Sequence, residues 1–136
     1  MPTGDFQDLR LWRRLTVQAL AGLVDEYPGG WVVPMTLIDK RYRDEIHGGL
    51  RRSGVPVRQF VLVVPEPVLR ARIDGDRTLP DEAREWRHRY VDAALAAIAD
   101  LRGEPDTVIL DASGAADAVA DRIVAECTDP ARRGGR

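Results

Sequence analysis

The sequence predicts an α/β domain built on a parallel sheet. Three short apolar runs alternate with helical patterns along the 136 residues. One of them, Phe60–Val64, is apolar at every position, which is typical of a strand buried on both faces of a parallel sheet. Helices between such strands predict right-handed crossovers and a three-layer arrangement, with helices flanking the sheet on both sides.

The first half of the chain predicts a helix, a strand and a second helix. Apolar residues recur at helical spacing over Asp8–Tyr27, and a Pro-Gly-Gly turn follows. Trp31–Met35 is a short apolar run after this turn, which predicts a buried strand. Asp39 is a suitable N-cap for a helix that reaches Ser53, and Gly54 is placed to end that helix.

The second half continues the alternation of strands and helices. Val57–Val64 predicts the central strand, and Pro67 suits the first turn of a helix that runs to Asp74. A long helix is predicted over Asp81–Leu101 and a third strand over Thr107–Leu110, with a last helix after it.

Composition predicts one cytoplasmic domain over residues 1–128 and a disordered polar tail over 129–136. The chain is 44% hydrophobic, which provides enough apolar content for one core. Its net charge of -2 gives no reason to expect binding to nucleic acid or to an anionic membrane. No apolar run approaches the roughly 20 residues that span a bilayer, and the first residues do not resemble a signal peptide. The single cysteine fits a reducing compartment.

Polar residues follow the predicted strands at their carboxyl ends, where open parallel sheets bind ligands. If the strands are parallel, these residues share one rim of the sheet: Thr36, Asp39, Glu66, Asp111 and Ser113. Asp39 and Ser113 have a second interpretation, since each also stands where a helix cap is expected.

Arginines gather around the segment 75–80, between two predicted helices. They are Arg70, Arg72, Arg77, Arg84, Arg87 and Arg89. Guanidinium groups bind phosphate in a bidentate manner, so a loop between these helices could close over a phosphoryl group. Acidic residues are interleaved with the arginines, however, and composition alone favours a solvated, salt-bridged face.

Other common site types are not indicated. His47 and His88 stand far apart in the sequence and lack Cys or His neighbours at ligand spacing, so no metal site is predicted. No nucleophile motif is present, and no Gly-x-x-x-x-Gly-Lys-[Ser/Thr] frame occurs in residues 1–136.

Four stretches carry a resemblance to a known family: PTGDFQDLRLWR, WVVPMTLID, RYRDEIHGGLRRSGVPVRQFVLV and VLRARIDGD. They resemble the tunicamycin-resistance-type ATP-binding proteins, which are small P-loop proteins similar to shikimate and chloramphenicol phosphotransferases. The resemblance covers the chain from Pro2 to about Glu126, and the segment Val33–Thr36 and the run from Asp44 to Leu62 are its most specific parts.

The resemblance implies ATP and Mg²⁺ as cofactors and a small-molecule substrate, and it implies three groups of site residues. These are lid arginines that contact ATP phosphates, a loop that packs on the adenine, and residues on the acceptor side. In this sequence they are Arg72, Arg77 and Arg87 for the lid, Asp111, Ser113 and Gly114 for the adenine loop, and Thr36 and Asp39 for the acceptor side.

The chain departs from the family at the phosphate-binding loop. Family members have a strand, a Gly-rich loop and a helix that are not among these residues, so the resemblance implies an incomplete P-loop kinase-like fold. That strand would lie between the strands ending at Met35 and Val64. Without it, those two strands either pair directly or leave open sheet edges, through which self-association is possible. Two functions follow: an ATP-dependent kinase or resistance protein in a full-length form, or a non-catalytic remnant or protein-binding module.

Overall fold

The structure, a computed structural model, describes residues 5–27, 29–78 and 80–128. The chain divides into two compact units, one reaching Val57 and the other beginning at Arg58. The single domain over 1–128 therefore stays a prediction, and the predicted disordered tail over 129–136 lies outside the described residues.

The first unit is a pair of helices with a small apolar core. A short 3₁₀ helix, η1 (Phe6–Asp8), precedes α1 (Arg10–Glu26), and α2 (Lys40–Arg52) follows a long extended segment. The core consists of Leu37, Ile46 and Leu50, with side chains of α1 and of the segments flanking α2 packed around it. Both helices lie where the apolar spacing predicted them, and the positive φ of 77° at Gly54 confirms that this glycine ends α2.

α1 and α2 approach closely at one glycine. A Cβ built on Gly49 would lie 2.9 Å from Cγ2 and 3.0 Å from Cγ1 of Val17. Gly49 lowers the intrinsic helix propensity of α2, but any side chain there would collide with α1. The glycine is therefore explained by packing.

The predicted strand over Trp31–Met35 is wrong. Residues 31–39 carry no regular secondary structure, and Val32 is 89% exposed. A strand forms only where a neighbouring strand accepts its backbone hydrogen bonds, and in the described residues this segment has no such neighbour. The apolar run is present, but none of the described residues forms a strand beside it.

The second unit contains the sheet. Two strands, β1 (Gln59–Val63) and β2 (Thr107–Asp111), pair in parallel, with Gln59 opposite Thr107 and Val63 opposite Asp111. Between them the chain forms α3 (Glu66–Gly75) and α4 (Asp81–Leu101), and α5 (Ala116–Thr128) follows β2. The α/β class and the parallel pairing are confirmed over the described residues, with two strands instead of the three expected.

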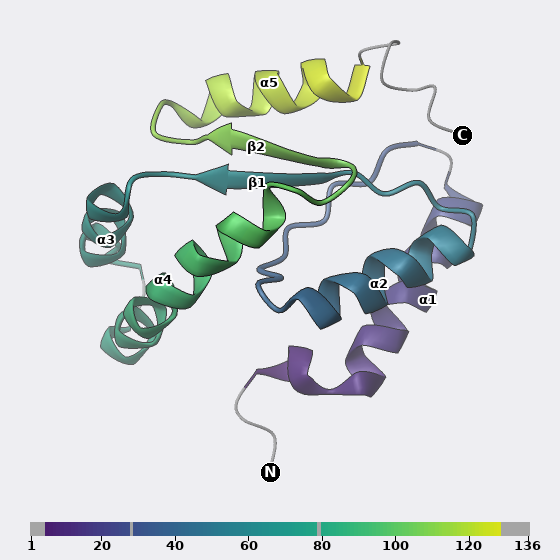
Figure 1. The fold of residues 1–136 in the computed structure, drawn as a ribbon, viewed down its shortest axis with the longest axis horizontal. Coiled ribbons are helices and arrows are strands. Elements are labelled where there is room, and N and C mark those ends of the chain that lie inside the picture. The colour runs from purple at the N-terminus through teal and green to yellow at the C-terminus, as the bar shows by residue number, and fades with distance from the viewer. Residues whose placement is uncertain (1–4, 28, 79, 129–136) are drawn as a thin grey trace. The chain divides into compact units, whose positions relative to one another are not determined.

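Helices lie on both sides of the strand pair. In Figure 1, α5 runs along one side of β1 and β2 and α4 lies on the other. α3 and α4 are in contact, Ile73 of α3 and Val91 of α4 are both buried, and an ion pair joins Arg70 to Asp92 at 2.8 Å. In the described part of the chain, no helix is long and apolar enough to cross a membrane.

Candidate functional site

The carboxyl ends of the two strands form the rim at which a ligand site is predicted. Because β1 and β2 are parallel, both carboxyl ends lie at the same edge, with the start of α3 and the carboxyl half of α4 beside them. A groove of about 650 Å³ lies here, lined by Val63, Val64, Pro65, Glu66, Leu95, Ile98, Ala99, Arg102, Asp111 and Ser113. Apolar walls with a few polar groups at the margin are typical of small-molecule sites.

The turn after β2 is held by its own side chains. Asp111 ends the strand, and its Oδ1 accepts a hydrogen bond from the backbone N–H of Ser113 at 2.8 Å. Hydrogen bonds from Ser113, first from its hydroxyl and then from its backbone N–H, lower the pKa of Asp111 below the ordinary aspartate value. Asp111, Ser113 and Gly114 are all exposed, so the predicted adenine loop is open to solvent in the second unit.

Arg72 reaches this turn from α3. Its Nη1 donates a hydrogen bond to the carbonyl of Ala112 at 3.0 Å, and its Nη2 donates to the carbonyl of Ser113 at 3.1 Å. The structure thus brings together one predicted lid arginine and the predicted adenine loop, which lie 40 residues apart in the sequence. The functional roles of both stay predictions.

Of the other two predicted lid arginines, Arg77 lies between α3 and α4, and Arg87 lies in the first half of α4. Arg87 forms an ion pair with Asp76 at 3.5 Å. Hydrogen bonds from Thr78 lower the pKa of Asp76, and the charge of Arg87 contributes to that lowering. Arg77 is exposed in the turn after α3. Neither arginine forms a hydrogen bond or ion pair with the Asp111–Gly114 turn in the described residues.

Several of the remaining arginines are paired with the acids interleaved among them. Arg70 pairs with Glu66 at 2.8 Å, and Arg84 pairs with Asp81 within the first turn of α4. These contacts favour the salt-bridged surface interpretation for Arg70 and Arg84. Arg72 differs from them, since it donates to backbone carbonyls, which do not neutralise its charge.

The predicted acceptor-side residues belong to the first unit. Thr36 is exposed, and Asp39 is the N-cap of α2, accepting a hydrogen bond from the N–H of Arg41 at 2.8 Å. A side-chain hydrogen bond from the Arg41 guanidinium lowers the pKa of Asp39 below its usual value. The cap interpretation of Asp39 is therefore confirmed, and a ligand role for Thr36 and Asp39 stays a prediction.

One residue that the sequence interpretation missed is Arg43. Its side chain is 1% exposed, and Nη1 donates to the carbonyls of Leu37 at 2.9 Å and Ile38 at 2.7 Å. The guanidinium thereby holds the segment between Thr36 and the start of α2 against that helix. Its position three residues before Ile46 and seven before Leu50 places it on the buried stripe of the helix, which was the available signal.

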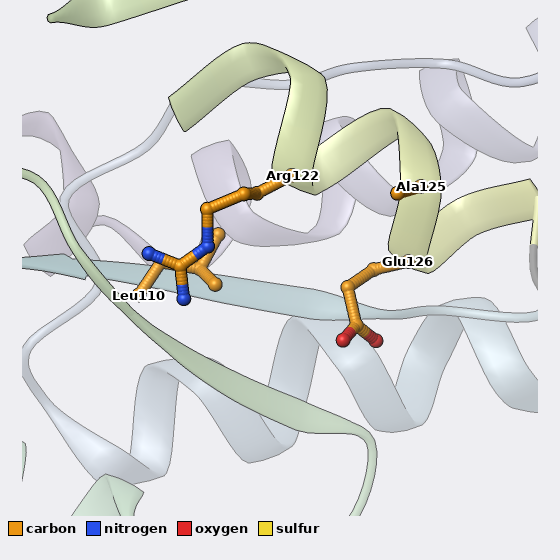
Figure 2. A pocket seen from close by; sticks show the side chains of 4 residues that line it. All are labelled: Leu110, Arg122, Ala125 and Glu126. Carbon is orange, nitrogen blue, oxygen red and sulfur yellow. The ribbon is translucent and has the colours of Figure 1, made fainter. Parts of the chain in front are cut away.

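A smaller hollow lies between α5 and β2 on the other side of the strands. It measures about 250 Å³, and Figure 2 shows the guanidinium of Arg122 beside Leu110, with Glu126 projecting from α5 further along the helix. Glu126 is held by Arg58, whose Nη2 lies 2.6 Å from Oε2. Across the described residues, no group of three or more His, Cys, Asp or Glu side chains is placed to hold a metal ion.

Parallel strands with intervening helices and an arginine docked on the turn after the last strand are consistent with the P-loop NTPase superfamily. No protein-family model and no curated protein matches the chain. Among solved structures, the chain is similar to the tunicamycin resistance protein of Deinococcus radiodurans, with a TM-score of 0.67 and 26% sequence identity. The match covers 93% of this chain and 72% of that protein. The chain has the fold of a tunicamycin-resistance-type protein, which confirms the resemblance seen in the sequence.

Proposed function

We propose that this chain is part of an ATP-binding, kinase-like resistance protein, either a phosphotransferase or a resistance-type ATPase in its full-length form. The observation that carries the proposal is the match to the Deinococcus tunicamycin resistance protein over 93% of the chain. The placement of Arg72 on the turn after β2 supports it, because an arginine and a strand-end turn then meet at the rim where such sheets bind ligands.

ATP and Mg²⁺ are the cofactors of the proposed activity. Arg72, Arg77 and Arg87 would contact the phosphates, and Asp111, Ser113 and Gly114 would border the adenine. Thr36 and Asp39 would stand on the side of a small-molecule acceptor. Arginine is suited to this lid role because its planar guanidinium binds phosphate oxygens in a bidentate manner at any physiological pH.

The phosphate-binding loop of the proposed protein would come from outside residues 1–136. A strand, a Gly-rich loop and a helix would supply the backbone N–H groups, the lysine and the magnesium-binding hydroxyl that cradle the phosphates. Their strand would also complete a three-layer kinase-like sheet. Translation of the DNA upstream of Met1 tests this: an in-frame Gly-Lys-[Ser/Thr] loop supports the proposal, and a stop codon close upstream contradicts it.

The direct test of function uses tunicamycin and ATP. A tunicamycin-sensitive bacterium that expresses the longest reading frame should survive higher tunicamycin concentrations than one carrying the Arg72→Ala variant. The affinity for ATP, measured by calorimetry, should be lower in the same variant. Arg70→Ala serves as a control, because Arg70 is paired with Glu66 and Asp92. Equal survival with and without the gene would reject a resistance function.

A second candidate is a non-catalytic remnant or protein-binding module. The observation that favours it is the sequence itself, since residues 1–136 contain no Gly-x-x-x-x-Gly-Lys-[Ser/Thr] frame. On this hypothesis the purified 136-residue chain neither binds ATP at micromolar concentration nor hydrolyses it. Measurable turnover by that chain would reject the second candidate.

A further inference from the structure

Asp76 connects the end of α3 with the first half of α4. Its Oδ1 accepts two hydrogen bonds from Thr78, one from the hydroxyl at 2.6 Å and one from the backbone N–H at 3.1 Å. Its Oδ2 lies 3.5 Å from Nη1 of Arg87. The backbone carbonyl of Asp76 also accepts from Nη1 of Arg84 at 3.5 Å. One carboxylate oxygen therefore fixes the local backbone, and the other faces a guanidinium.

Arg87 differs from the other predicted lid arginines because an acid already balances its charge. Arg72 donates to backbone carbonyls, and Arg77 is exposed in the turn after α3. Among the described residues, Asp76 is the acid that pairs with Arg87. Hydrogen bonds from Thr78, from its hydroxyl first, lower the pKa of Asp76, and the charge of Arg87 adds to that lowering. Asp76 is therefore ionised at neutral pH and presents a full negative charge to Arg87.

We propose that Asp76 is an internal competitor for the phosphoryl group at Arg87. Its carboxylate holds the guanidinium when the site is empty and is displaced when phosphate oxygens bind there. This inference rests on the proposed function, which assigns Arg87 to the phosphates of ATP. A guanidinium binds carboxylate and phosphate through the same N–H donors, so the two anions exclude each other at the donors that they share.

The contact between Asp76 and Arg87 is suited to displacement by a highly charged ligand. The two side chains are 29% and 47% exposed, and water and salt screen an ion pair at such a site. A polyphosphate carries more negative charge than one carboxylate and can bind the guanidinium in a bidentate manner. A ligand with a single carboxylate gains little by replacing Asp76. The contact thus favours polyphosphate ligands over simple carboxylates at this arginine.

The test removes the charge of Asp76 and keeps its shape. In Asp76→Asn the amide oxygen can still accept from Thr78, but Arg87 loses its anionic partner. In the longest reading frame, the dissociation constant for ATP, measured by calorimetry, should fall about two- to fivefold. Asp74→Asn is the matched control, because it removes the same charge where the carboxylate contacts His88 at 2.7 Å instead of an arginine. The control should change the dissociation constant less than Asp76→Asn does.

A double-mutant cycle assigns the effect to Arg87. In an Arg87→Ala background, Asp76→Asn should leave the affinity for ATP unchanged, because the guanidinium for which the two anions compete is gone. An unchanged or higher dissociation constant in Asp76→Asn, an equal gain in Asp74→Asn, or a gain that persists without Arg87 overturns this inference and leaves the proposed function intact. If neither the wild type nor any variant binds ATP, the proposed function is rejected and this inference with it.

Discussion

The guanidinium of Arg72 donates hydrogen bonds to the backbone carbonyl of Ser113 at 3.1 Å and to that of Ala112 at 3.0 Å. An α3 side chain thus fixes the turn after β2, although the two segments are far apart in the sequence. Guanidinium carries five N–H donors, and these two bonds leave others available for an anion at the rim.

Replacing Arg72 by alanine should therefore destabilise the second unit slightly. The turn loses two hydrogen bonds, but both carbonyls remain accessible to water because the site is exposed. The expected loss in the free energy of unfolding is about 1 kcal/mol, measured by urea denaturation. Arg77→Ala is the control, since the Arg77 side chain is exposed in a turn, and its effect should stay within about 0.5 kcal/mol. Equal losses in the two variants would contradict the role given to Arg72.

Gly49→Ala should destabilise the first unit. The new Cβ would lie 2.9 Å from Cγ2 of Val17, on the facing helix. Overpacking costs about 1–3 kcal/mol, which the gain in helix propensity of about 1 kcal/mol only partly offsets. Thermal denaturation should show a lower Tm.

Two variants check that steric collision is the cause. Gly48→Ala should be neutral or stabilising, because its Cβ would meet only the flexible end of Arg52, at 3.2 Å. Adding Val17→Ala to Gly49→Ala should recover part of the lost stability. If Gly48→Ala and Gly49→Ala lower Tm equally, packing of α1 on α2 does not explain Gly49.

Arg43→Met should lower the free energy of unfolding of the first unit by more than the loss of an exposed ion pair lowers it. The carbonyls of Leu37 and Ile38 lose a buried donor, and each unsatisfied group costs about 1–3 kcal/mol. Arg41→Met is the comparison, because the pair of Arg41 with Asp39 lies at the surface and contributes about 0–1 kcal/mol. Urea denaturation of both variants measures the difference, and similar midpoints would show that the buried guanidinium does not stabilise the segment before α2.

The Asp111 turn should make stability depend on pH in the acidic range. Ser113 lowers the folded pKa of Asp111, so the ionised Asp111 carboxylate stabilises the folded state at pH values above the unfolded pKa of about 3.9. This contribution is lost as the pH falls through the folded pKa. Ser113→Ala should raise the Asp111 pKa toward the ordinary value, measured by carboxyl ¹³C NMR. An unchanged titration midpoint would show that Ser113 is not the cause.

The helices could be predicted closely because their signals are local. The expected helix Asp81–Leu101 coincides with α4, and Asp39 caps α2 as the sequence indicated. The run Trp31–Met35 has the apolar composition of a strand, yet it remains irregular. Strand formation requires a neighbour that supplies hydrogen bonds, and composition does not reveal whether that neighbour is present.

The candidate site was predicted in part. Parallel pairing of β1 and β2 follows from continuous apolar strands joined by helices, and it brings both carboxyl ends to one rim. The contact between Arg72 and Ser113 could not be foreseen, since it depends on how α3 turns its side chains relative to the strand ends. The buried Arg43 was missed because a charged residue on an apolar stripe resembles an interruption of that stripe.

The sequence by itself determined the α/β class, the helix limits, the caps and the resemblance to tunicamycin-resistance-type proteins, because these depend on local periodicity and residue identity. Only the tertiary structure decided that β1 pairs with β2 alone in the described residues. It also decided that Leu62 is exposed while Leu110 is buried, and that Arg72 lies on the turn after β2. These features depend on contacts between residues distant in the chain, and such contacts are set by which partners are present to pack and to accept hydrogen bonds.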